Sequence, residues 1–132
     1  MTGERILVVE DNEKNMKLFR DVLGATGFST IEATTGERAV ELATEHAPSL
    51  VIMDVRLPHV DGVEALARLR ADDRTAAIPV LAVTAQAMQG DRERFLAAGF
   101  DGYLSKPLDI VELVDTVRRH CGAAGAEGEP RG

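Results

Sequence analysis

The stretch Leu50-Val51-Ile52-Met53-Asp54 places a run of large apolar residues directly before a carboxylate. A run of this length without polar alternation is typical of a strand that is buried on both faces, as in a parallel sheet covered by helices. Three further short runs have the same character, and they are Ile6–Val9, Val80–Val83 and Gly102–Leu104. The sequence therefore predicts four buried parallel strands.

A polar residue with a chemical use follows each predicted strand within two positions. In chain order these residues are Glu10 and Asp11, Asp54, Thr84, and Lys106. Ligands of parallel sheets bind just beyond the carboxyl ends of the strands. We therefore expect three acids, a hydroxyl group and an ammonium group to converge on one site.

Apolar residues return with a period near 3.6 between the predicted strands, which indicates helices with one buried stripe. They are Met16, Phe19, Val22 and Leu23, then Ala39, Leu42 and Ala43, then Val63, Leu66 and Leu69. Chain breakers are predicted to lie between these segments, at Gly24, Gly27, Pro48, Pro58, Pro79 and Gly99. Phe28–Ala33 is predicted as a fifth strand, and its polar residues suit an edge position in the sheet.

Alternating strands and helices with short connections predict an α/β fold, an open doubly wound sheet of five parallel strands with five helices. The length of 132 residues fits a single domain. We expect that domain to cover residues 1–121. Residues 122–132 are predicted to be a flexible tail, because they include no large apolar side chain.

The overall composition excludes several kinds of partner. The formal net charge of −7 argues against a nucleic-acid partner, since such recognition normally needs a basic surface. No apolar stretch approaches the roughly 18 residues that a membrane span needs, so we expect no membrane insertion. Cys121 is the only cysteine, which rules out an internal disulfide and favours a reducing, cytoplasmic compartment.

The predicted meeting of Glu10, Asp11 and Asp54 requires a compensating positive charge. Two carboxylates about 4 Å apart repel by roughly 4 kcal/mol at the effective dielectric of a partly buried site. Protonation, a nearby lysine or a divalent cation can relieve this repulsion, and Lys106 supplies only part of the charge. Three hard oxygen ligands favour Mg²⁺, which readily bridges carboxylates and an incoming phosphoryl group.

The same residues suit phosphoryl transfer. This reaction needs an in-line nucleophile and hydrogen-bond donors placed where the equatorial oxygens arrive. Asp54 is the candidate nucleophile, and Lys106 and Thr84 are the candidate donors. A carboxylate nucleophile forms a mixed anhydride that hydrolyses readily, so the chemistry favours a short-lived phosphoryl mark.

Five motifs occur in a fixed order along the chain. They are Val8-Val9-Glu10-Asp11-Asn12, Met53-Asp54-Val55-Arg56-Leu57-Pro58, Asp61-Gly62, Val83-Thr84-Ala85 and Gly102-Tyr103-Leu104-Ser105-Lys106-Pro107. With these motifs the chain resembles the response-regulator receiver family from Arg5 to about His120. The resemblance implies a flavodoxin-like sheet with strand order 2-1-3-4-5.

The resemblance also implies a role for each site residue. Asp54 corresponds to the phosphoacceptor, and Thr84 and Lys106 would contact the phosphoryl group. Glu10 and Asp11 would form the acidic pocket, with Mg²⁺ bound by Asp11, Asp54 and the backbone carbonyl of Arg56. Tyr103 would change its rotamer when Thr84 moves. The Lys106–Pro107 bond is expected to be cis.

Partners follow from the same resemblance. A histidine kinase or a histidine phosphotransfer protein would dock on the first helix near Asn15 and Met16 and phosphorylate Asp54. A downstream effector protein would read the altered surface, which comprises Ala87–Ala97, Tyr103 and the final helix through Ile110, Leu113, Val114 and Val117.

Two segments and the short tail make the chain look most like stand-alone DivK-type cell-cycle receivers. These segments are Asp11-Asn12-Glu13-Lys14-Asn15-Met16-Lys17-Leu18-Phe19 and Thr84-Ala85-Gln86-Ala87-Met88. A receiver domain cut from a hybrid histidine kinase would look much the same, so this alternative stays open.

Arg56 departs from the common receiver pattern, in which a neutral side chain often stands two residues after the acceptor. Its guanidinium would reach the phosphoryl group or Glu10 and slow or redirect hydrolysis, with Gln86 as a second tuning position. The alternative is an arginine turned to solvent.

Three other classes of function are weighed against a receiver. A phosphatase of the haloacid dehalogenase type also forms an aspartyl phosphate, but it needs a second Asp where Arg56 stands. A flavodoxin-like nucleotide binder would need a glycine-rich phosphate loop after Val9. A degenerate receiver would bind partners without phosphorylation, which the full set of acceptor-site residues disfavours. We therefore expect a phosphoacceptor that dephosphorylates itself and is not a multiple-turnover enzyme.

Overall fold

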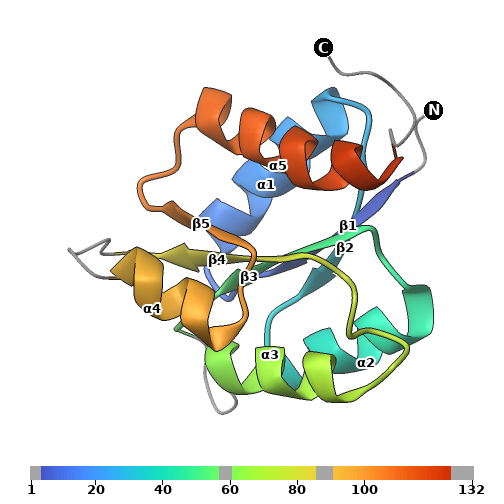
Figure 1. Cartoon of the computed structure of the whole chain (residues 1–132). Helices are drawn as coiled ribbons and strands as arrows, with labels where there is room; N and C mark the ends of the chain where they lie inside the picture. Colours follow the sequence, from blue (N-terminus) through green and yellow to red (C-terminus); the bar gives the residue numbers. More distant parts are fainter. Residues whose placement is uncertain (1–3, 57–60, 86–90, 126–132) are drawn as a thin grey trace.

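The computed structural model of the protein describes residues 4–56, 61–85 and 91–125. They form a five-stranded parallel sheet with helices on both faces (Figure 1). The strands are β1 (Arg5–Val9), β2 (Ser29–Ala33), β3 (Leu50–Asp54), β4 (Val80–Thr84) and β5 (Gly102–Ser105). The helices are α1 (Glu13–Ala25), α2 (Gly36–His46), α3 (Gly62–Ala71), α4 (Asp91–Ala98) and α5 (Ile110–Gly125). The strand order β2-β1-β3-β4-β5 confirms the predicted doubly wound, flavodoxin-like sheet.

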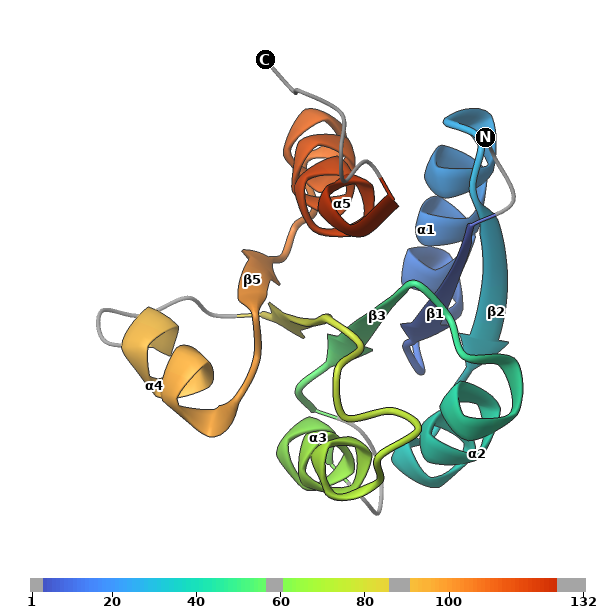
Figure 2. The same ribbon diagram turned by 45° about the vertical axis from the view of Figure 1, so that its right-hand side comes forward.

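Each face of the sheet has its own hydrophobic core, because successive strand residues point to opposite sides. Alternate residues of β1 show this division: Leu7 and Val9 pack with α2 and α3, whereas Ile6 and Val8 pack with α1 and α5. Figure 2 shows α1 and α5 on one side of the sheet and α2 and α3 on the other. This double coverage explains why the inner strands have no polar alternation.

The edge position predicted for the polar strand is confirmed. β2 covers Ser29–Ala33 and pairs only with β1 in the described part of the chain. Ser29 and Glu32 are exposed and Thr30 and Ile31 are half-buried, so Ala33 is the one buried residue of this strand. A strand with one free edge tolerates such polarity because it lacks a second neighbouring strand.

Side-chain caps begin the helices that follow the strands. Asn12 caps α1 by accepting a hydrogen bond from the backbone N–H of Asn15 at 3.0 Å. Asp61 caps α3 in the same way, with the N–H of Glu64 at 2.9 Å. Because each cap satisfies a free N–H of the first turn, it fixes where the helix starts relative to the carboxyl end of the preceding strand.

Three sequence predictions need correction. Gly24 lies within α1, since the helix continues to Ala25, and a glycine in the last turn costs only about 1 kcal/mol. Val63 is 44% exposed, because the buried stripe of α3 passes beside it through Ala65, Leu66 and Leu69.

The third correction concerns the start of the predicted flexible tail. α5 extends to Gly125, so the first four residues of the predicted tail are helical, which suits the good helix formers Ala123 and Ala124. The rest of the predicted tail, Gln86, and motif residues Leu57 and Pro58 lie outside the described residues. In the ranges that the structure describes, no helix is long and apolar enough to cross a membrane.

Candidate functional site

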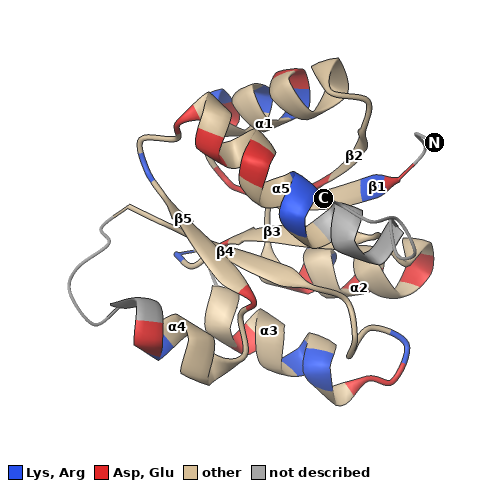
Figure 3. Ribbon diagram, turned by 45° about the horizontal axis from the view of Figure 1, so that its top comes forward, with Lys and Arg blue, Asp and Glu red and all other residues tan. Residues whose placement is uncertain are grey.

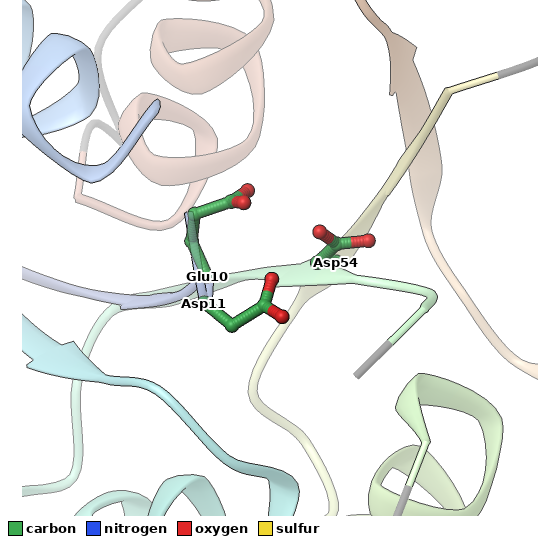
Figure 4. A group of neighbouring side chains, drawn as sticks. All are labelled: Glu10, Asp11 and Asp54. Carbon is green, nitrogen blue, oxygen red and sulfur yellow. The ribbon is translucent and has the colours of Figure 1, made fainter. Parts of the chain in front are cut away.

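Three carboxylates meet at the carboxyl ends of two neighbouring strands. Glu10 and Asp11 follow β1, and Asp54 ends β3, which pairs with β1. One oxygen from each carboxylate lies within 4.8 Å of the others, and Figure 4 shows the three side chains gathered about one space. Glu10 is 1% exposed and Asp54 5%, whereas Asp11 is exposed. The structure thus brings together the acids that the sequence predicts to converge.

Lys106 reaches two of these acids from the loop that follows β5. Its Nζ donates to Asp54 Oδ2 at 3.0 Å and to Glu10 Oε2 at 3.3 Å. The backbone N–H of Lys106 donates to the carbonyl of Thr84 at 2.8 Å, which fixes the start of the loop after β5 against the end of β4. The Lys106–Pro107 bond is cis, as predicted.

Burial and neighbouring charges shift the pKa values of both Glu10 and Lys106. Burial raises the pKa of the Glu10 carboxyl, and the negative charge of Asp54 raises it further, against the opposing effect of Lys106. Burial lowers the pKa of the Lys106 ammonium, but its hydrogen bond to Asp54 and the nearby acidic charges outweigh burial and raise it. Lys106 is therefore a full positive charge at neutral pH.

The charge at the site remains negative. One ammonium group does not balance three carboxylates, and Glu10 Oε1 is buried without a hydrogen-bond partner among the described residues. Carboxylate oxygens are ligands that Mg²⁺ prefers. The donor set formed by Glu10, Asp11 and Asp54 therefore fits a divalent cation.

Both oxygens of Asp54 have donors. Oδ1 accepts from the backbone N–H of Arg56 at 2.9 Å, and Oδ2 accepts from Lys106. These contacts hold the carboxylate in one orientation. A carboxylate held in this way has an oxygen available as a nucleophile and a cation already placed to stabilise transferred negative charge.

The other predicted site residues occupy different surroundings. Thr84 ends β4 next to β3 and is half-buried. Tyr103 lies in β5 with its ring centroid 6.2 Å from that of Phe95, so its ring packs against α4. Arg56 is exposed, and within the described residues its guanidinium makes no hydrogen bond or ion pair.

The predicted partner surface needs one correction. Leu113 and Val117 are fully buried and pack on the sheet, so they do not face a partner. Ile110 is exposed and Tyr103 is half-buried, so both remain accessible to a partner. The helical periodicity of the sequence does not predict which face of the last helix, α5, packs against the sheet.

The sequence did not identify two features that build the site. Glu10 Oε2 accepts from the backbone N–H of Asn12 at 3.2 Å and lies 3.5 Å from Asn15 Nδ2, so the first turn of α1 positions this acid. Gly62 packs on the acceptor loop: an added Cβ would lie 2.6 Å from the carbonyl oxygen of Asp54 and 2.8 Å from Val55 Cα. The asparagine cap was a readable signal for the first feature, whereas the second appears only in three dimensions.

Comparison with known proteins identifies relatives along most of the chain. The family model for the response regulator receiver domain matches residues 6–118. The polar-differentiation response regulator DivK of Brucella anthropi is 46% identical over 119 residues, which is 90% of this chain and 97% of that protein. DivK of Brucella abortus strain S19 is 45% identical over the same shares. The predicted resemblance to DivK-type receivers is confirmed.

Solved structures agree with this assignment. The receiver domain of the sensor histidine kinase PA1611 from Pseudomonas aeruginosa PAO1, which has a magnesium ion in its active-site cleft, gives a TM-score of 0.84 at 37% identity. That match covers 92% of this chain and 99% of that domain. The Francisella response regulator 1452 receiver domain gives 0.85 at 26% identity, over 92% of this chain and 98% of that domain. The chain therefore belongs to the response regulator receiver domain family.

Proposed function

We propose that this receiver accepts a phosphoryl group on Asp54 and signals the presence of that group to an effector protein. The donor would be a histidine kinase or a histidine phosphotransfer protein. The observation that carries the proposal is the setting of the Asp54 carboxylate, which is 5% exposed, lies beside two other acids and accepts from Lys106 Nζ at 3.0 Å. An aspartate with a purely structural role would not need two further carboxylates and a lysine ammonium group beside it.

The transfer step uses groups that the chain already holds in place. A carboxylate oxygen of Asp54 attacks phosphorus in line with the leaving group, and the P–N bond of the donor phosphohistidine breaks as the new P–O bond forms. The electron pair of the broken bond stays on the imidazole, which takes up a proton. Lys106 then neutralises negative charge on the phosphoryl oxygens, with Thr84 as a second donor.

A Mg²⁺ ion fits the acids of the same site. Glu10, Asp11, Asp54 and the backbone carbonyl of Arg56 would hold it, as the unpaired Glu10 Oε1 and the uncompensated charge suggest. When bound, the ion supplies charge neutralisation between the carboxylates and the phosphoryl oxygens. Hydrolysis of the mixed anhydride by water returns Asp54 to its carboxylate form, so the chain acts as an acceptor and not as a multiple-turnover enzyme.

The output surface is built from α4, β5 and α5. Leu96, Tyr103, Glu112, Thr116 and Arg119 line one groove between these elements. When Thr84 moves toward the phosphoryl group, Tyr103 would fill the space that it leaves and change this groove. An effector that binds the two arrangements with different affinity would read the change.

Two further expectations and one alternative accompany this proposal. Residues 1–121 form the receiver domain, and the protein acts in the cytoplasm, since a single cysteine suits a reducing compartment. A receiver domain that is part of a hybrid histidine kinase is the second candidate, favoured by the likeness to the PA1611 receiver domain.

Asp54→Asn is expected to abolish labelling by a small phosphodonor. Wild-type protein incubated with acetyl phosphate and Mg²⁺ should gain the mass of one phosphoryl group, and that mass should be lost in mild alkali, as expected of an acyl phosphate. The measurement is intact-protein mass spectrometry, with a parallel sample in which EDTA removes the metal and labelling should fail.

Asp21→Asn is the matched control for this experiment, because Asp21 is an exposed aspartate on α1 that pairs only with Lys17 in the described structure. It should label like the wild type. Equal labelling of the Asp54→Asn protein would refute the proposed acceptor.

Arg56→Asn is expected to shorten the lifetime of the phosphoryl group by up to about tenfold, because the arginine side chain would no longer obstruct the attacking water. The measurement is the decay of the labelled mass after the donor is removed. Arg38→Asn is the control, since Arg38 lies on α2 and pairs with Glu41. An unchanged lifetime would show that Arg56 is simply turned to solvent.

A further inference from the structure

One arginine joins three segments at the end of the sheet that lies opposite the acids. The Arg70 guanidinium, in the last turn of α3, donates to the carbonyls of Ala76 at 3.0 Å and Ile78 at 2.7 Å, which precede β4. It also donates to the Gly99 carbonyl at 3.0 Å and to Asp101 Oδ2 at 2.9 Å, which lie between α4 and β5. Figure 3 shows the basic end of α3 and an acidic position just before β5. We call this set of contacts the Arg70 clamp.

The turn after α4 is also tied directly to the first residue of β4. The N–H of Asp101 donates to the Val80 carbonyl at 2.8 Å, and the N–H of Val80 donates back to Asp101 Oδ2 at 2.8 Å. Asp101 Oδ2 therefore accepts from both Val80 and Arg70. Because hydrogen bonds with ionised partners are stronger than those between neutral groups, these contacts hold the turn firmly against the sheet.

α4 ends in a closed turn that leads into the clamp. The N–H of Gly99 donates to the Leu96 carbonyl at 3.1 Å, and the N–H of Phe100 donates to the Phe95 carbonyl at 3.1 Å. Gly99 has a positive φ of 114°, as is common for a glycine that ends a helix. The last turn of α4 is thus joined to the clamp through the backbone.

Packing along the rest of α4 is sparse. Among residues 93–98, whose side chains the structure describes, only Phe95 is buried, and Leu96 is 41% exposed. The centroid of the Phe95 ring lies 6.0 Å from that of Phe100 and 6.2 Å from that of Tyr103. One buried side chain fixes the angle between a helix and a sheet only weakly. α4 is therefore anchored at its end and loosely packed along its length.

We propose that Arg70 is a positioning residue for the output surface, because its clamp holds the C-terminal end of α4 fixed while the rest of the helix tilts. β4 links the clamp to the acceptor site, since Val80 starts the strand and Thr84 ends it about 13 Å away. α4 follows β4 in the chain, so a change at Thr84 reaches its N-terminal end first. A helix held at the other end responds by tilting, which alters the contact between Phe95 and Tyr103. The anchoring is independent of the proposed function, whereas the tilt on phosphorylation rests on it.

Amide hydrogen exchange in unphosphorylated protein tests the anchoring, with Arg70→Lys as the variant. Lysine keeps the charge, but one ammonium group cannot replace a guanidinium that bonds to two segments. In the wild type the amides of Phe100 and Asp101 should exchange at least about tenfold more slowly than those of residues 96–98, although helix ends ordinarily fray. Arg70→Lys should remove most of this difference. Amides of β3 report unfolding of the whole domain, so the ratio of exchange rates between Asp101 and β3 separates local release from a loss of overall stability.

Arg68→Lys is the matched control for this comparison. Arg68 lies on the same helix, is exposed and pairs only with Glu64 in the described structure. Its replacement should leave the exchange of Phe100 and Asp101 as in the wild type.

The tilt is tested in protein phosphorylated with acetyl phosphate and Mg²⁺, with the phosphorylated fraction measured by intact mass. Tyr103 is the only tyrosine and the chain has no tryptophan, so intrinsic fluorescence reports the surroundings of this one ring. Phosphorylation should change the fluorescence of the wild type and leave the Asp101 amide protected. Arg70→Lys should gain the same mass but show at most about half of the fluorescence change.

Two results would overturn the proposal. They are wild-type exchange in the Arg70→Lys protein, and loss of Asp101 protection when the wild type is phosphorylated. A wild type that gains no phosphoryl mass would instead refute the proposed function, and the exchange comparison alone would then decide whether Arg70 positions α4.

Discussion

Replacing Lys106 with alanine is expected to slow phosphoryl transfer to Asp54 by about a hundredfold to a thousandfold. Lys106 Nζ is the only side-chain donor recorded on the Asp54 carboxylate among the described residues, at 3.0 Å from Oδ2. Because this ammonium group already lies at the site, it needs no reorganisation to stabilise charge as it develops on the phosphoryl oxygens. The rate of mass gain with acetyl phosphate and Mg²⁺ measures the effect.

Two further variants separate the role of Lys106 in transfer from its role in folding. Lys17→Ala removes an exposed lysine that pairs with Asp21 on α1 and should label at the wild-type rate. Lys106→Arg keeps the charge but changes the shape of the donor, so it should restore the rate only in part. A Lys106→Ala protein that labels as fast as the wild type would exclude Lys106 from the transfer step.

Gly62→Ala is expected to lower the free energy of unfolding by about 1–3 kcal/mol, because the new methyl group overpacks a tight contact. A Cβ at this position would lie 2.6 Å from the Asp54 carbonyl oxygen and 2.8 Å from Val55 Cα, and both are backbone atoms that cannot turn aside. The N–H of Gly62 also donates to the Val55 carbonyl at 3.0 Å, which ties α3 to the acceptor loop. Urea denaturation followed by circular dichroism measures the change.

The matched substitution Gly24→Ala should have the opposite sign. Gly24 lies within α1, and an added Cβ meets nothing within 4 Å. Alanine there should raise the free energy of unfolding by about 0.5–1 kcal/mol through its better helix propensity. Equal effects of the two substitutions would contradict the close approach of Gly62 to the acceptor loop.

The sequence predicts the sheet well because burial on both faces leaves a strong signal. Leu50–Met53 has no room for polar residues between two layers of helices, and its boundary with Asp54 marks the carboxyl end of the strand, where the site begins. The same signal predicts that the acids of neighbouring strands meet. The register that sets Val9 beside Met53 then follows from pairing between adjacent strands.

Features that depend on long-range packing are not predictable in this way. The contact between Lys106 and Glu10 joins residues 96 positions apart, and its geometry depends on the path of the loop after β5. The tight approach of Gly62 depends on how α3 lies against β3. Val63 fits a helical stripe in the sequence, but the angle at which α3 meets the sheet leaves it exposed.

The position of the labelled residue tests the central claim most directly. Borohydride reduces an acyl phosphate to the corresponding alcohol, so protein labelled with acetyl phosphate and then reduced carries a permanent record of the acceptor. Peptide mass spectrometry should find the reduced residue at position 54 and at no other aspartate or glutamate. A reduced residue at another position, or none in protein that has gained the phosphoryl mass, would contradict the assignment of Asp54 as the acceptor.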